Sequence, residues 1–227
     1  MMTYAIGLNF HGIGKPKRVL EPGEAPYWVS LGKFEYMLDQ VAAAPDPSRF
    51  VITFDDGNLS DHDIALPALT ARGLQAHFFV LTSRIGQHGA LDAGHIRALR
   101  DAGMTIGSHG IDHVAWPTLN DTALERELRD SRVRLEDICG QQVTEAGIPF
   151  GRYDARVLKA LRAANYATAW SSDSGKFRTH AFLRPRTSLR GDMSESMTTL
   201  ILSGQMSPLR RLRRALGMTQ RRWMVTG

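Results

Sequence analysis

The sequence predicts an α/β fold with mainly parallel strands, because strand-like and helix-like segments alternate along most of the chain. Apolar runs, several of them rich in β-branched residues, predict the strands. The six candidates are residues 4–10, 50–54, 76–81, 104–107, 144–148 and 167–170. A chain of 227 residues, 43% of them hydrophobic, is long enough for one sizeable core. We therefore expect a single parallel sheet or barrel, with its chemistry at the carboxyl ends of the strands.

Helix start and stop signals lie between the later strands. Asp92 is a good N-cap residue for one helix. Thr122 and Glu125 have the spacing of a capping box, and Gly140 would end the helix that they start. Asp154 predicts the N-cap of a third helix. These helices complete the alternation that the parallel fold requires.

Proline and glycine restrict two other segments. A helix that starts after Asp61 tolerates Pro67 only if the proline lies in its first turn. Residues 12–33 contain several glycines and prolines, and they predict a long loop over one end of the barrel.

The charge of the chain is unevenly distributed. The net charge is +5, but residues 207–227 contain six arginines and no acidic residue. Without this segment the acidic residues exceed the basic ones by one, which argues against a body that binds nucleic acid. We expect two units, a barrel domain at residues 1–206 and a basic tail at residues 207–227.

Composition also bears on location. No segment approaches the roughly 18 uninterrupted apolar residues of a membrane-spanning helix. Cys139 is the single cysteine, so no disulfide can form within the chain, which fits a reducing compartment. Residues 1–11 resemble a first strand more than a signal peptide. We expect a cytoplasmic protein, with the inner face of the membrane as an alternative site of action.

Polar side chains follow two of the predicted strands. Asp55 and Asp56 come at the end of one strand, and His109 and His113 come at the end of another. Each pair alone has an ordinary explanation, because Asp-Asp-Gly is typical of a turn and paired histidines occur on helix surfaces. Together they match a hydrolytic zinc site, which uses three protein ligands and an open position. Asp56, His109 and His113 supply such a set, and Asp55 remains as a general base for a bound water.

Three motifs make the sequence recognisable. They are TFDDG at 53–57, IGSHGIDH at 106–113 and IPFGRYD at 148–154. Over roughly residues 4 to 190, the chain resembles the polysaccharide deacetylase family, also called the NodB-type domain or carbohydrate esterase family four. The resemblance implies a distorted, incomplete (β/α) barrel that removes acetyl groups from N-acetyl sugars with the help of a divalent metal ion.

The resemblance also implies roles for individual residues. Asp55 would be the catalytic base, and the backbone N–H of Phe150 would be the oxyanion donor. The implied metal ligands are Asp56, His109 and His113.

Two of the departures from the family pattern concern groups that would act with Asp55. Family members often carry an arginine shortly before the proline of the third motif, where it orients the catalytic aspartate, and here that position is Gly147. Arg186, on a following strand, is our candidate replacement. The late histidine that usually protonates the leaving amine has no clear counterpart, since no histidine follows His180. The acid is left open between His180, another residue and a metal-bound water.

Three further side chains are predicted to bind substrate. His11 ends the first strand and would line the pocket. Tyr153 and Trp170 lie near the expected rim, where either ring would stack on a sugar, and the alternative for both is a place in the core.

The tail admits two interpretations. Leu209, Leu212 and Leu216 have helical spacing and lie between arginines. This pattern is typical of an interfacial helix that is attracted to anionic lipid. The alternative is a solvated, partly disordered C-terminus.

These observations give one main hypothesis for function. We expect a metal-dependent deacetylase that hydrolyses the N-acetyl group of an amino sugar in a poly- or oligosaccharide, with a lipid-linked substrate and exopolysaccharide synthesis as its expected setting. One divalent ion, with zinc favoured by the ligand set, is the expected cofactor. The expected partner is the N-acetylated carbohydrate, with no nucleic acid and no obligate protein partner. The alternatives are a deformylase or amidase of another acylated sugar and a catalytically silent glycan-binding relative.

Overall fold

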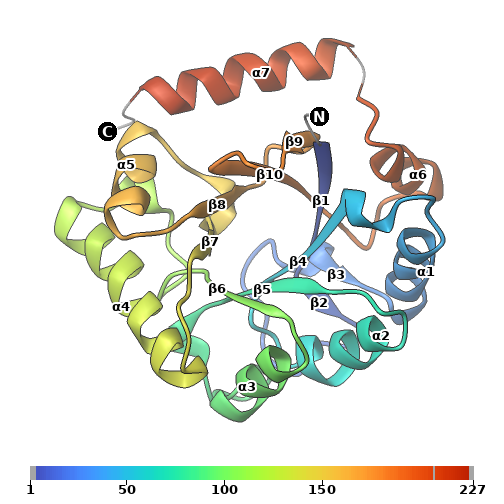
Figure 1. Cartoon of the computed structure of the whole chain (residues 1–227), viewed down its shortest axis with the longest axis horizontal. Coiled ribbons are helices and arrows are strands. Elements are labelled where there is room, and N and C mark those ends of the chain that lie inside the picture. Colours follow the sequence, from blue (N-terminus) through green and yellow to red (C-terminus); the bar gives the residue numbers. More distant parts are fainter. Residues whose placement is uncertain (1–3, 207, 225–227) are drawn as a thin grey trace.

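The computed structural model describes residues 4–206 and 208–224. Seven parallel strands form a barrel with helices around it (Figure 1). They are β1 (Tyr4–Phe10), β4 (Phe50–Asp56), β5 (Ala76–Val80), β6 (Thr105–Ser108), β7 (Glu145–Gly147), β8 (Thr168–Ser171) and β10 (Leu183–Ser188). The barrel closes where β10 pairs with β1, with Gly7 opposite Arg186. The predicted (β/α) barrel with mainly parallel strands is therefore confirmed, with one strand fewer than the usual eight.

Local sequence predicted most of the strands. All six predicted strands are present, and each lies within two residues of its expected bounds. The short strand β9 (Lys176–Arg178) was not predicted, and it pairs antiparallel with the start of β1. This extra strand makes the barrel irregular beside its closing seam.

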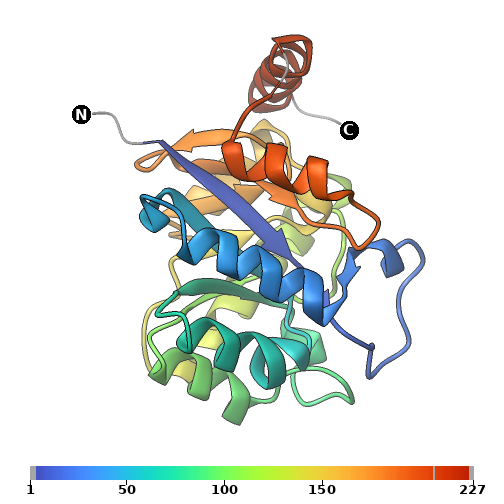
Figure 2. The same cartoon turned by 90° about the vertical axis from the view of Figure 1, so that its right-hand side faces the viewer.

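The helices cover the outside of the barrel (Figures 1 and 2). They are α1 (Leu31–Ala42), α2 (Leu66–Thr70), α3 (Ala93–Asp101), α4 (Asp121–Cys139), α5 (Ala155–Ala163), α6 (Glu195–Ser203) and α7 (Pro208–Trp223). Among the residues that the structure describes, no helix is both long enough and apolar enough to cross a membrane.

Helix caps followed the predictions in two cases out of three. Asp92 accepts a hydrogen bond from the first turn of α3, and Asp154 does the same for α5. The predicted capping box at Thr122 is wrong, because Asn120 is the N-cap of α4 and accepts a hydrogen bond from the N–H of Ala123. Asn120 was available in the sequence as an equally good cap.

The segment 12–33 is only partly the loop that the sequence predicted. It contains a small parallel pair, β2 (Gly12–Ile13) and β3 (Trp28–Val29), and its last residues belong to α1. The signal for α1 was present, because Ser30 caps the helix and its buried residues recur with helical spacing. Pro67 does lie in the first turn of α2, which a π-helix at Asp61–Ala65 precedes.

Alternation along the strands separates two environments. On β4, Ile52 and Phe54 belong to the large hydrophobic cluster. Phe54 stacks on Phe78 with ring centroids 4.6 Å apart. Thr53 and Asp55 alternate with them and point the other way, toward the inside of the barrel. The outward-facing apolar residues of β4 therefore pack in the layer beneath the helices, while its inward-facing positions 53 and 55 carry polar groups.

The described part of the tail is a helix that packs on the barrel. Met218 of α7 is buried, and the guanidinium of Arg221 forms an ion pair with Asp173. Just after the helix, the carbonyl of Met224 accepts a hydrogen bond from the N–H of Ala155 at the start of α5 (3.1 Å). These contacts join the described part of the tail to the body, and Figure 1 shows α7 running from the side of α6 to that of α5.

Candidate active site

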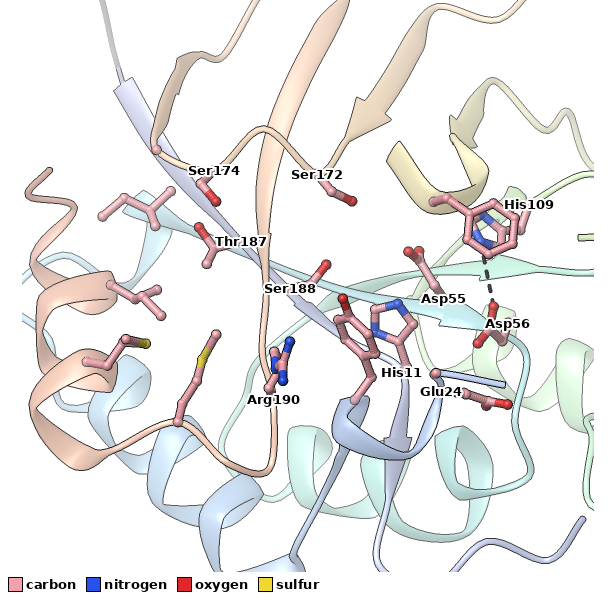
Figure 3. A pocket seen from close by; sticks show the side chains of 18 of the residues that line it. His11, Glu24, Asp55, Asp56, His109, Ser172, Ser174, Thr187, Ser188 and Arg190 are labelled. Atoms are coloured by element: carbon pink, nitrogen blue, oxygen red, sulfur yellow. Dashed lines mark ion pairs between the residues drawn. The ribbon is translucent and has the colours of Figure 1, made fainter. Parts of the chain in front are cut away.

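The residues singled out at the strand ends meet in one cavity of about 500 Å³ (Figure 3). Asp55 and Asp56 come from the end of β4, and His109 and His113 come from the segment after β6. The cavity is lined by all four. The parallel fold brings them together because the carboxyl ends of neighbouring strands meet at one end of the barrel.

Three of these side chains can hold a metal ion. One atom each of Asp56, His109 and His113 lies within 4.8 Å of the other two. The Oδ1 atom of Asp56 is 3.6 Å from the Nε2 atom of each histidine, which is too long for a hydrogen bond. Two ligands of a tetrahedral zinc ion lie about 3.3 Å apart, as its bond lengths and angles require. That same Oδ1 is buried and has no hydrogen-bond partner within the described residues. The site therefore fits a divalent ion.

Left-handed backbone conformations aim several groups at the cavity. Asp56 has φ of 79°, His113 has 51° and Phe150 has 56°. Such values are costly for residues other than glycine, and they cluster at functional sites. At Asp56 the turn breaks the alternation of the strand, so both adjacent carboxylates reach the same cavity. The Asp-Asp-Gly pattern had indicated a turn, and in the structure the left-handed conformation includes both Asp56 and Gly57.

Hydrogen bonds orient both histidines. The Nδ1–H of His109 donates to the carbonyl oxygen of Gly147 (2.8 Å), and the Nδ1–H of His113 donates to a carboxylate oxygen of Glu21 (2.7 Å). Both rings thereby turn Nε2 toward Asp56. A partner on the second nitrogen fixes the tautomer and raises the basicity of a metal-bound histidine.

Sequence reasoning missed Glu21. It lies in the loop of residues 12–33, 92 positions before His113, and it also pairs with Arg84. The sequence signal was weak, since the loop was expected over one end of the barrel but no acid in it was singled out. Glu21 lines the cavity, so this loop contributes to the site directly.

Asp55 is held by a separate set of partners. Its two oxygens accept hydrogen bonds from the two terminal nitrogens of Arg186 (2.7 and 2.9 Å), and the side-chain N–H of Asn9 donates to one of them (2.8 Å). The Arg186 side chain is fully buried. Gly7 leaves room for it, because a Cβ atom at position 7 would lie only 2.9 Å from the Cγ atom of Arg186. Asn9 was also missed by the sequence analysis.

The environment sets the charges of these groups. Burial alone would raise the pKa of Asp55, but the Arg186 guanidinium holds it well below its usual range. Burial would also raise the pKa of Asp56, and the nearby histidines lower it on balance. Burial lowers the pKa of His109 to about 4, so the ring is neutral at pH 7 and able to bind a metal. Burial, and then the nearby carboxylates of Asp56 and Asp55, raise the pKa of Asp61 well above its usual value.

The cavity also contains two other predicted residues. His11 and Phe150 both line it, and the Phe150 ring stacks on His113 with centroids 4.3 Å apart. The Nδ1 atom of His11 is buried and has no hydrogen-bond partner in the part of the chain that the structure describes. His180, in contrast, is exposed and lies outside the residues that line the cavity.

The predicted rim positions of Tyr153 and Trp170 are wrong. Tyr153 is buried, and its hydroxyl donates to Asp173 (2.8 Å). Trp170 is fully buried, packs edge-on against Phe177 and donates its Nε1–H to Glu145 (2.9 Å). Neither belongs to the cavity lining, because both rings fill the core instead.

A family model and curated relatives match part of the chain. Residues 42–169 match the family model described as Polysaccharide deacetylase. YxkH of Bacillus subtilis (strain 168), which its name assigns to the polysaccharide deacetylases, is 30% identical over 131 residues, or 58% of this chain and 47% of the relative. A chitooligosaccharide deacetylase of Rhizobium leguminosarum bv. trifolii is 26% identical over 133 residues, or 58% of this chain and 60% of the relative. The matches thus span about half the length of these curated relatives.

A solved structure has the same fold. The Streptococcus pyogenes deacetylase PplD, solved in complex with acetate, superposes with a TM-score of 0.74 at 19% identity. The match covers 89% of this chain and 99% of that chain. At this identity the similarity supports the fold alone.

We expect Glu21→Ala to weaken metal binding by about 10- to 100-fold, because His113 loses the acceptor that fixes its ring. Competition for zinc with a chromophoric chelator measures the affinity. Glu125→Ala, which removes an exposed carboxylate of α4, is the matched control and should bind zinc like the wild type. Equal affinities in the two variants would show that Glu21 does not orient the ligand.

We expect Arg186→Lys to lower kcat/KM by about 10²-fold and to move the acidic limb of the pH–rate profile to higher pH. The lysine cannot reproduce the two parallel hydrogen bonds, so the pKa of Asp55 rises and more of the base is protonated at low pH. The exposed Arg178→Lys on β9 serves as the control. An unchanged acidic limb in Arg186→Lys would contradict this assignment of the pair.

Proposed function

The chain belongs to the polysaccharide deacetylase family, and we propose that it is a metal-dependent hydrolase that removes the N-acetyl group of an amino sugar in a poly- or oligosaccharide. The confirmed family and fold support the general reaction. The observation that carries the proposal is that two adjacent aspartates have different partners. Asp55 is paired with Arg186, whereas Asp56 lies beside the two histidines.

Asp56, His109 and His113 would hold the ion, which we propose to be zinc on the basis of its ligand preferences. A bound zinc ion supplies Lewis acidity, polarising the amide carbonyl and lowering the pKa of a water molecule. Both histidines are fixed with Nε2 toward the carboxylate that completes the set. The three side chains leave the rest of the cavity to substrate and water.

Asp55 is proposed as the general base. It is ionised and buried, and it lines the same cavity as the ligand set. Arg186 and Asn9 fix the carboxylate from the inside of the barrel. In this position Asp55 takes the proton of the attacking water, and Arg186 acts as a positioning residue.

Two further roles complete the proposal. The backbone N–H of Phe150 stabilises the negative charge that develops on the carbonyl oxygen, and the ring stacked on His113 places this turn beside the ligand set. We assign the proton donor for the leaving amine to His11, which lines the cavity near Asp55 (Figure 3). This assignment replaces the late histidine of the family pattern.

We extend the proposal to the setting of the reaction. We favour a lipid-linked precursor of an exopolysaccharide as the substrate. The protein would reach this substrate by binding the membrane surface through α7. Removal of another small acyl group, such as formyl, uses the same groups and is the second candidate. A silent glycan-binding relative would not need an oriented base beside an oriented ligand set, and the geometry therefore disfavours it.

The proposal is tested by acetate release from N-acetylglucosamine oligomers. We expect Asp55→Asn to lower the rate by at least about 10²-fold while one equivalent of zinc stays bound, because the base is lost and the ligands are kept. We expect His109→Ala to lose the metal. The exposed Asp137→Asn on α4 is the control and should keep both zinc and activity. Stoichiometric zinc without turnover of any acylated sugar would refute the enzymatic function.

We expect the effect of His11→Gln to depend on the leaving group. The rate on N-acetyl sugars should fall by about 10²–10⁴-fold, because a basic amine must be protonated as it leaves. The loss should be much smaller on an acetanilide with an electron-poor ring, whose amine leaves without a strong acid. His180→Gln, an exposed histidine outside the cavity, is the control. Equal losses on both substrates would rule out His11 as the proton donor.

A further inference from the structure

The cavity has a second section whose chemistry differs from that of the metal end. Beyond Arg190 its wall is formed by α6 and the segments on either side of that helix. The apolar side chains of this section are Ile6, Met193, Met197, Leu200, Ile201 and Met206, and Ser174 and Thr187 border it on the side of the strands (Figure 3). Figure 3 shows the side chains of α6 facing the same space as the acids and histidines.

These side chains suit an apolar chain better than a sugar. A sugar is bound by stacking on aromatic rings and by hydrogen bonds, whereas thioether and aliphatic groups offer neither. Met197 and Leu200 remain 45% and 41% exposed, although they face the cavity. Flexible methionines adapt to long apolar ligands. An apolar ligand would therefore gain free energy by covering this wall.

The apolar section continues toward α7. A second hollow beside it shares Gly175, Gly204, Gln205 and Met206 with the cavity and is also lined by Arg211 and Arg214 of α7. The cavity and this hollow thus adjoin, and together they extend from the metal ligands, past α6, to α7. A ligand that fills both would be polar at one end and apolar in the middle.

The outer face of α7 gives a second, independent observation. Arg214, Met218 and Arg221 turn toward the barrel and hold the helix there. Leu212 and Leu216 point away from it and are 58% and 63% exposed. Leu209 and Trp223 share this outer face, with 58% and 82% of their surface exposed.

The charge around this apolar stripe indicates what would cover it. Arg211, Arg213 and Arg222 are exposed on α7, and the helix contains no acidic residue. An apolar stripe with arginines beside it is the pattern of a helix that lies in the interface of an anionic bilayer. A protein partner would need acidic groups at matching positions, whereas an anionic lipid surface supplies negative charge everywhere along the helix.

We propose that the protein takes a lipid-linked N-acylated amino sugar from an anionic bilayer, with α7 lying in the interface and the apolar section of the cavity holding part of the lipid chain. The sugar then reaches the metal end while the chain passes along α6. This inference deepens the proposed deacetylase function and rests on it for the reaction, but not for the binding.

The first experiment measures binding of two probes to the zinc-loaded full chain in an Asp55→Asn background, which keeps the probes intact. The probes are dodecyl and methyl N-acetylglucosaminide, used as monomers in isothermal titration calorimetry. We expect the dodecyl compound to bind at least about tenfold more tightly, because its chain covers apolar surface. In Met197→Gln and Leu200→Asn this advantage should largely disappear, while Val133→Asn on the exposed face of α4 should retain it.

Equal affinity for the two probes would overturn the apolar subsite, and so would an advantage that survives both α6 substitutions. Failure of the proposed function has a different signature: the dodecyl probe binds tightly, but the wild-type protein releases no acetate from any acylated sugar. Thermal unfolding of each variant verifies that a loss of binding does not reflect a loss of fold.

The second experiment tests the surface of α7. The full chain is sedimented with phosphatidylcholine vesicles, with and without phosphatidylglycerol. We expect binding to the anionic vesicles that weakens with salt and falls at least about tenfold in the Leu212→Gln/Leu216→Gln double variant. Val133→Gln, which removes an exposed apolar residue of α4, should bind like the wild type. No binding to anionic vesicles, or equal binding by the double variant, would overturn the membrane-interface part of the proposal.

Discussion

The buried ion pair between Asp55 and Arg186 is the interaction on which the site depends. It joins β4 to β10 inside the barrel, and Asn9 of β1 hydrogen-bonds to both side chains. The pair therefore spans the seam where β10 meets β1 and closes the barrel. Removal of one partner from such a buried pair typically costs about 3–5 kcal/mol, because an uncompensated charge remains. Closure of the barrel and ionisation of the proposed base are thus coupled.

This pair makes two adjacent carboxylates chemically unequal. Asp55 has its oxygens occupied by charged and polar donors, so it stays ionised but is not free to wrap an ion. Asp56 keeps a buried oxygen without a hydrogen-bond partner among the described residues, facing two oriented histidines. One residue is prepared to accept a proton and the other to bind a cation. The left-handed turn at Asp56 allows both to face one cavity.

Features that local sequence patterns determine, such as strands and motif residues, were predicted. Features that depend on contacts between distant segments were missed. The strand ends could be predicted because apolar runs are local. The two aspartates and two histidines of the site could be predicted because the spacing within each motif is local. Glu21 was invisible, since its partner His113 lies 92 positions away and no periodicity links the two. Trp170 was assigned to the rim because its strand ends near the site. Only the packing of neighbouring strands shows that its ring points into the core.

The most direct test of this account is anomalous diffraction at the zinc edge from crystals grown with zinc. The account predicts a single strong peak bonded to Asp56 Oδ1 and to Nε2 of His109 and His113. It also predicts that Asp55 stays outside the coordination sphere and remains paired with Arg186. A peak elsewhere, or a structure in which Asp55 leaves Arg186 to bind the ion, would contradict the proposed division between ligand and base.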